Sequence, residues 1–96
     1  MGLDVTVPRE GECPIAPLLR ALEESGIDAT VVMVDAALQM PNAPVPDGWR
    51  DLRLKTSAGT VTLKRSSQAI AVVVFGNADD ALLAVQRRIA EALRQG

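Results

Sequence analysis

Histidine and tyrosine are absent from this sequence of 96 residues, and cysteine, tryptophan and phenylalanine each occur once. Without histidine, the sequence excludes catalysis by an imidazole base and lacks one of the two usual ligands of structural zinc. A single cysteine cannot close a disulfide within the chain. We therefore expect no metal and no cofactor, and a protein that is not an enzyme.

Long hydrophobic runs are also missing. No apolar stretch approaches the roughly 20 residues that a membrane span requires. No basic segment followed by an apolar one opens the chain, and the single cysteine agrees with a reducing compartment. These features predict a cytoplasmic protein that does not bind membranes.

The composition indicates a folded domain with an uneven distribution of charge. With 48% hydrophobic and 23% charged residues, the chain resembles an ordinary globular protein, and its length suits a single domain over residues 1–96. Residues 1–48 hold two basic and eight acidic side chains, whereas residues 49–96 hold eight basic and four acidic ones. This asymmetry either steers association with a second copy or an anionic partner, or reflects chance segregation.

Local patterns predict the elements of the first half. Apolar and polar residues alternate over 3–7, as in a strand with one buried face. Pro14 suits the first position of a helix, and apolar residues then recur at helical spacing towards Gly26, a typical residue beyond a helix end. β-branched residues over 29–35 indicate a second strand. Three prolines predict a long loop over 36–48, because proline cannot join the interior of a sheet.

The second half predicts three strands and a helix. Residues 50–56 and 60–65 alternate between apolar and polar, with Gly59 in the hairpin between them. The continuous apolar run over 69–75 indicates a buried strand. Asn77 is a typical cap for the final helix, whose apolar residues recur at helical spacing.

This order predicts an α+β fold, a two-layer sandwich with the order β-α-β-(long Pro loop)-β-β-β-α, a mostly antiparallel sheet and both helices on one face. Two strands, at 31–34 and 70–75, are apolar on both sides, as in a sheet covered on both faces. Since two helices cover one face only, we expect the other to be covered there by the proline-rich loop or by a second subunit. The candidate side chains in and beside the loop are Leu38, Met40, Val45 and Trp49.

Cys13 lies where the first helix is expected to begin, and a helix N-terminus favours the thiolate form of cysteine. The pair Cys13-Pro14, after a first strand, resembles the Cys-Pro-x-Pro motif of the TusA-like sulfur carriers, with the second proline one position late, at Pro17. The resemblance covers residues 1–35 and implies a thiol-based sulfur carrier in which Cys13 is the reactive thiol. The alternative is an inert cysteine that acts as a small hydrophobe.

Basic side chains gather on the alternating strands, where Arg53, Lys55, Lys64 and Arg65 form a candidate interaction surface. Such a cluster suits phosphate groups. The order of elements also resembles that of the ribosome hibernation promoting factors, which bind ribosomal RNA through basic surfaces, and this implies an RNA- or ribosome-associated factor. The chain is nevertheless acidic overall, no aromatic is placed to stack on bases, and basic residues also protect strand edges.

Trp49, at the end of the proline-rich loop, belongs to the same candidate surface under one of two hypotheses. It is either an anchor for a partner, as tryptophan often is at interfaces, or a plug that fixes the loop to the sheet. We favour the plug, because the large apolar area of tryptophan usually becomes mostly buried.

Together these features favour a small non-catalytic module for protein–protein interaction or regulation, acting as a homodimer or as a subunit of a larger complex. The expected partner is a protein, with nucleic acid less favoured. RNA binding through the basic sheet face and sulfur transfer through Cys13 are the alternatives.

Overall fold

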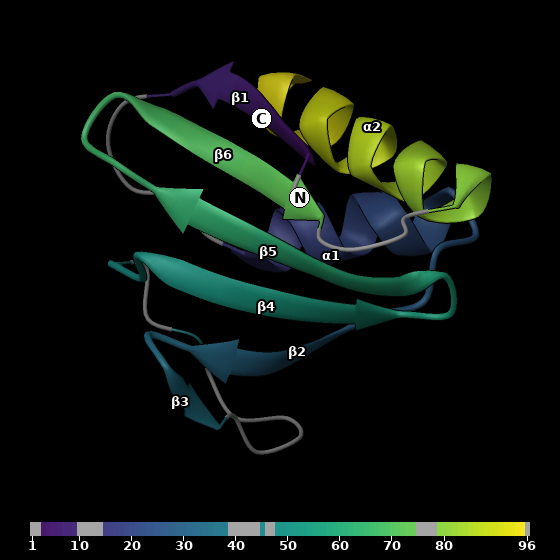
Figure 1. Ribbon diagram of the computed structural model, residues 1–96, viewed down its shortest axis with the longest axis horizontal. Helices are drawn as coiled ribbons and strands as arrows, with labels where there is room; N and C mark the ends of the chain where they lie inside the picture. The colour runs from purple at the N-terminus through teal and green to yellow at the C-terminus, as the bar shows by residue number, and fades with distance from the viewer. Residues whose placement is uncertain (1–2, 10–14, 39–44, 46–47, 75–78, 96) are drawn as a thin grey trace.

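The computed structural model describes residues 3–9, 15–38, 45, 48–74 and 79–95 (Figure 1). The order of helices and strands along the chain is the predicted one, with one additional short strand. The elements are β1 (Leu3–Pro8), α1 (Ile15–Glu24), β2 (Ala29–Val34), β3 (Ala37–Leu38), β4 (Asp51–Thr56), β5 (Gly59–Arg65), β6 (Ala69–Val74) and α2 (Asp80–Gln95).

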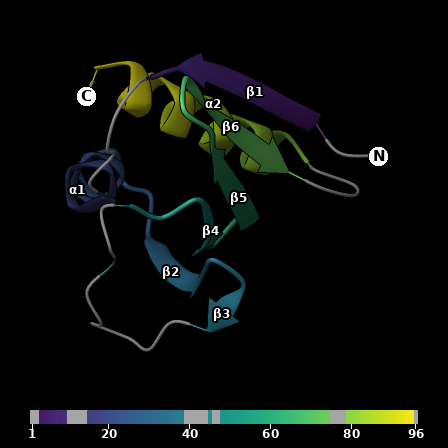
Figure 2. The same cartoon turned by 90° about the vertical axis from the view of Figure 1, so that its left-hand side faces the viewer.

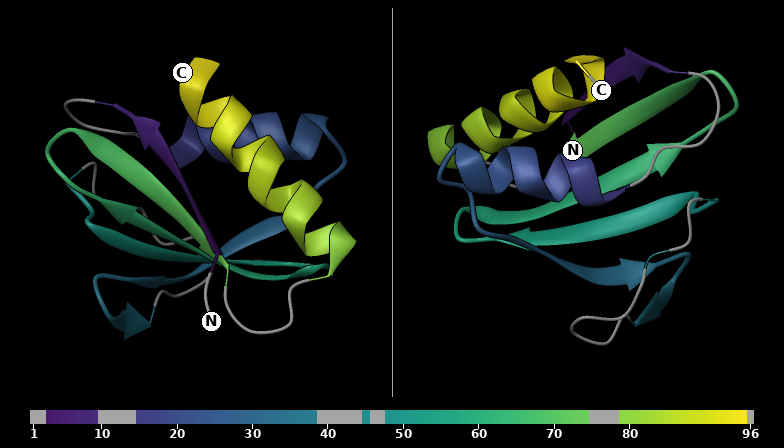
Figure 3. Two further views of the ribbon diagram at one scale, coloured as in Figure 1. Left: turned by 45° about the horizontal axis from the view of Figure 1, so that its top comes forward. Right: turned by 180° about the vertical axis from the view of Figure 1, so that it is seen from behind.

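The strands form one sheet in the order β1-β6-β5-β4-β2-β3, and every neighbouring pair is antiparallel. The sheet twists strongly between its edge strands, β1 and β3 (Figure 2). Both helices pack on the same side of it, as the view from behind shows (Figure 3). The predicted two-layer α+β arrangement is therefore confirmed.

The expected loop over 36–48 begins later than predicted, because Ala37–Leu38 forms the short strand β3. Asp35 and Ala36 make the two-residue turn between β2 and β3, with φ angles of 50° and 68°. Positive φ angles at both positions are those of a type I′ turn, a left-handed backbone that glycine adopts readily and alanine resists. Because no glycine stands there, the usual glycine signal of such a turn is missing from the sequence.

The apolar character of β2 has a local cause. Its register against β4 shifts between Val31 and Met33, which indicates a bulge with Val32 as the extra residue. The bulge allows both Val31 and Val34 to face the helices, where they are 9% and 7% exposed. On a regular strand, two residues three positions apart would face opposite sides of the sheet. The apolar run of β2 therefore does not require a cover on both faces of the sheet.

The core lies between the sheet and the two helices. On β4 the buried positions alternate with exposed or half-buried ones, as the sequence predicts. Each large apolar side chain buried here contributes about 1.5–3 kcal/mol relative to an exposed one. The largest fully buried side chains are Leu22 of α1, Ile89 of α2, Leu52, Leu54, Leu63 and Ile70 of the sheet, and Trp49.

Both ends of α2 are fixed by side chains. Asp79 caps the first turn, because its Oδ1 accepts a hydrogen bond of 2.9 Å from the backbone N–H of Leu82. The predicted cap, Asn77, lies outside the described residues. At the other end the guanidinium of Arg9 donates a hydrogen bond of 3.0 Å to the carbonyl oxygen of Leu93. The helix is thereby held against the β1 side of the sheet.

Candidate functional site

The candidate site is the face of the sheet opposite the helices, which no other described element covers (Figure 1). We call it the open face. Strand pairing and the alternation of side chains define its members. They are Asp4 and Thr6 of β1, Thr30 and Met33 of β2, Leu38 of β3, Asp51, Arg53 and Lys55 of β4, Thr60, Thr62 and Lys64 of β5, and Ala71 and Val73 of β6.

Three of the predicted basic residues, Arg53, Lys55 and Lys64, lie together on the open face. Arg53 stands directly opposite Thr62 across the β4–β5 pair. Lys55 stands opposite Thr60 in the same register. All three basic side chains are exposed, and none forms a hydrogen bond or ion pair with another described residue. The centre of the open face is therefore positively charged.

Two carboxylates moderate this charge. Asp51 lies opposite Lys64, on the same strand as the other two bases. Asp4 lies on the edge strand β1, opposite Val73. Because exposed charges are screened beyond about 8 Å at physiological ionic strength, the positive potential is confined to the part of the face around β4 and β5.

Arg65 does not belong to this cluster, although the sequence suggested it. It lies opposite Ile70 and therefore faces the helix side, as the period of two along a strand requires after the outward Lys64. Its guanidinium carbon lies 5.3 Å from the centre of the Trp49 ring, within cation–π range. Its backbone N–H donates a hydrogen bond of 2.7 Å to the carbonyl of Arg50.

Trp49 is fully buried in the same apolar cluster as the helix side chains, so it does not present a surface to a partner. This is the position that the plug hypothesis describes. Val45, also from the proline-rich segment, is half-buried against that cluster. These two residues therefore cover the helix side, whereas Leu38 is 86% exposed on the open face, and Met40 lies outside the described residues.

Little apolar surface remains on the open face. Val73 faces this side, yet it is only 8% exposed and does not belong to the main core cluster, so side chains of the chain itself shelter it. Met33 is half-buried, and Leu38 beside it is exposed. The bulge in β2 and the shelter of Val73 explain most of the two-sided apolar pattern without a second subunit.

Asp35 was not singled out in the sequence, but it anchors one end of the open face. Its Oδ1 accepts hydrogen bonds from the backbone N–H groups of Arg50 at 2.9 Å and Asp51 at 3.0 Å. The bond from Asp51, then that from Arg50, lowers the pKa of the Asp35 carboxyl below its ordinary value. Its position directly after a strand, where aspartate often bonds a turn, was the available signal. The contact holds the start of β4 against the β2–β3 turn.

Three remaining questions from the sequence concern the thiol, metal ligands and membrane-spanning helices. Cys13 is outside the described residues. Within the described ranges, no three acidic or cysteine side chains are grouped so that they would hold a metal ion. Neither helix in this part of the chain combines the length and apolar character that crossing a membrane requires.

Comparison of the chain with protein families, with curated proteins and with solved structures found no match. A function for this chain therefore has to be inferred from the geometry of the open face.

Proposed function

We propose that the protein is a non-catalytic interaction module that binds the acidic surface of a protein partner through the open face. The observation that supports this most directly is the cluster of Arg53, Lys55 and Lys64. These exposed cations share the side of the sheet that no other described element covers, and none of them forms an ion pair with another described residue. Charges arranged in this way accelerate association with a complementary surface and determine its orientation.

Apolar contact at one end of the open face favours a protein over RNA. A row of neighbouring side chains crosses β3, β2 and β4 through Leu38, Met33 and Arg53. The exposed Leu38 therefore lies two strand spacings, or about 10 Å, from the strand that carries Arg53. A protein surface that presents an apolar side chain near a carboxylate fits this row. Among the described residues, no aromatic side chain lies on the open face to stack on bases, since Trp49 is buried on the other side.

The size of the face indicates the kind of complex. Strands about 4.8 Å apart and roughly 20 Å long give the open face an area of about 400–500 Å². A typical stable interface buries about 800 Å² on each partner. We therefore expect a weak, reversible complex whose affinity falls as salt is added.

We also propose a cytoplasmic location, with which the single cysteine agrees.

Capture from lysate by matched charge-reversal variants tests this proposal. The double variant Arg53→Glu/Lys55→Glu changes the open face, and Arg20→Glu/Arg94→Glu makes the same change of charge on exposed positions of the two helices. We expect the wild type and the helix variant to retain the same partner, and the open-face variant to lose it. Retention by all three proteins would refute the proposal.

Two further outcomes would identify a different kind of partner. Loss of the captured material on nuclease treatment would identify RNA as the ligand. A wild-type dimer in sedimentation, converted to a monomer by the open-face reversal, would identify a second copy of the chain.

A further inference from the structure

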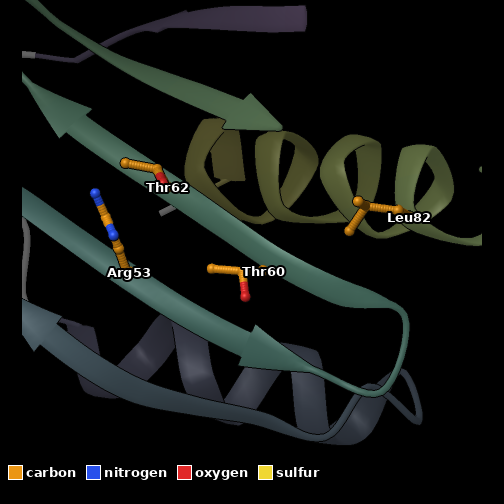
Figure 4. Close-up of a pocket in the computed structure, with 4 residues that line it drawn as sticks. All are labelled: Arg53, Thr60, Thr62 and Leu82. Atoms are coloured by element: carbon orange, nitrogen blue, oxygen red, sulfur yellow. The ribbon is translucent and has the colours of Figure 1, made fainter. Parts of the chain in front are cut away.

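A recess of about 370 Å³ lies at the edge of the open face, where β5 extends beyond its neighbour β6 and meets the first turn of α2 (Figure 4). The β5–β6 register ends at Thr62 and Val73, whereas β5 continues to Gly59 and stays paired with β4 along that length. The described residues that line the recess are Arg53, Thr60, Thr62 and Leu82.

The position of Leu82 depends on Gly59. The Cδ2 atom of Leu82 lies 3.2 Å from where a Cβ on residue 59 would stand, which is tighter than ordinary van der Waals contact. Gly59 also has a φ angle of 142°, a conformation that favours glycine. The β4–β5 hairpin can therefore approach the first turn of α2 closely enough for Leu82 to form an apolar wall of the recess.

Thr62 provides the main indication of a ligand. The residue is only 4% exposed, and its hydroxyl forms no hydrogen bond with another described residue. Yet none of the described side chains has a fully enclosed nitrogen or oxygen atom without a partner. The hydroxyl of Thr62 therefore keeps some exposure, and Thr62 lines the recess. Arg53 extends from β4 towards this residue, and Thr60 projects from β5, the strand that carries Thr62 (Figure 4).

We propose that the recess binds the oxyanion of a small organic ligand, a carboxylate or a phosphate. The guanidinium of Arg53 supplies parallel N–H donors that match two oxygens, and the hydroxyls of Thr60 and Thr62 supply neutral donors. No described carboxylate lines the recess. Leu82 offers apolar contact to the rest of the ligand, and the volume lies within the range of about 300–1,000 Å³ typical of small-molecule sites.

An NMR titration of the ¹⁵N-labelled protein tests this site. Inorganic phosphate and acetate are added separately, each compared with sodium chloride at equal ionic strength. We expect saturable shifts centred on Arg53, Thr60 and Thr62 that chloride does not cause, and the more tightly bound anion identifies the phosphate or the carboxylate class. Shifts that do not saturate, or that spread equally over Lys64, would refute the proposal.

Variants of the buried threonine separate a specific site from general attraction to a basic face. Thr62→Val removes the hydroxyl and leaves every charge in place, so we expect affinity to fall about tenfold, the effect of one hydrogen bond to a charged group. Thr62→Ser keeps a hydroxyl and should retain binding. Thr30→Val, on the same face but outside the recess, should have no effect. Equal affinity in the Thr62→Val and Thr30→Val variants would refute the proposal.

The oxyanion site does not depend on the proposed protein partner, and the two are tested separately. Arg53→Gln, at an exposed position, gives a second test of the recess if Thr62→Val fails to fold. It should abolish the saturable shifts, and retained shifts would refute the proposal. Lys64 lies outside the recess. The variant Lys64→Glu should therefore weaken the protein complex, while its affinity for phosphate or acetate stays within about twofold of the wild-type value.

Discussion

Threonine substitutions at Val72 and Val73 should have very different effects on stability, although the two residues are neighbours on β6. Val72 faces the helices and is fully buried, whereas Val73 faces the open side and is 8% exposed. Threonine has nearly the shape of valine, so each substitution exchanges a methyl group for a hydroxyl with little change in packing. The comparison therefore measures which side of the sheet is the core.

At position 72 the new hydroxyl enters an apolar core, and burying it without a partner costs about 1–3 kcal/mol. At position 73 the hydroxyl lies directly opposite Thr62, whose own hydroxyl can pair with it, so we expect a smaller cost than at position 72, below about 1 kcal/mol. For a domain of this size, a loss of about 2 kcal/mol lowers Tm by roughly 8–16 °C.

Urea denaturation followed by tryptophan fluorescence measures both effects. Trp49 is the only tryptophan, the chain has no tyrosine, and the indole is fully buried, so its emission reports the core directly. Far-ultraviolet circular dichroism provides an independent probe. Equal destabilisation by Val72→Thr and Val73→Thr would refute the assignment of the two faces.

Four further predictions concern single side chains. Ala36→Gly should raise the free energy of unfolding by about 0.5–1 kcal/mol in urea titrations, because glycine removes the strain of a left-handed alanine on an exposed turn. Asp35→Ala should be less stable than the wild type at neutral pH. Because the folded pKa of Asp35 is lowered, this difference should disappear in melts as pH falls through that pKa. Arg65→Ala should cost about 1 kcal/mol and shift the emission maximum of Trp49, whose ring it covers. Gln86→Leu should cost about 1 kcal/mol in thermal melts, because its Nε2 donates a hydrogen bond of 2.9 Å inside the protein.

The alternating strands were predictable because their period of two is visible in the sequence. It places Arg53 and Lys55 on the same side as Lys64, and the structure brings these three residues together. The same rule excludes Arg65, since consecutive residues of a strand face opposite sides, and grouping it with Lys64 was wrong.

Other features depend on contacts that no local pattern expresses. The apolar run of β2 does not reveal which valine is the extra residue of the bulge. The turn at Asp35 has no glycine to indicate it and is held by backbone groups far along the chain. The recess exists because Leu82 of α2 meets the β4–β5 hairpin, a contact set by the packing of the helix on the sheet.

Docking of a partner on the open face is tested most directly by chemical-shift mapping with the captured partner. When the partner is added to the ¹⁵N-labelled protein, we expect the largest shifts at Arg53, Lys55 and Lys64, reduced by added salt. Exposed positions of the helices, such as Arg20 and Arg94, should remain unperturbed. Shifts concentrated on the helices, with the three basic residues of the open face unchanged, would contradict the account.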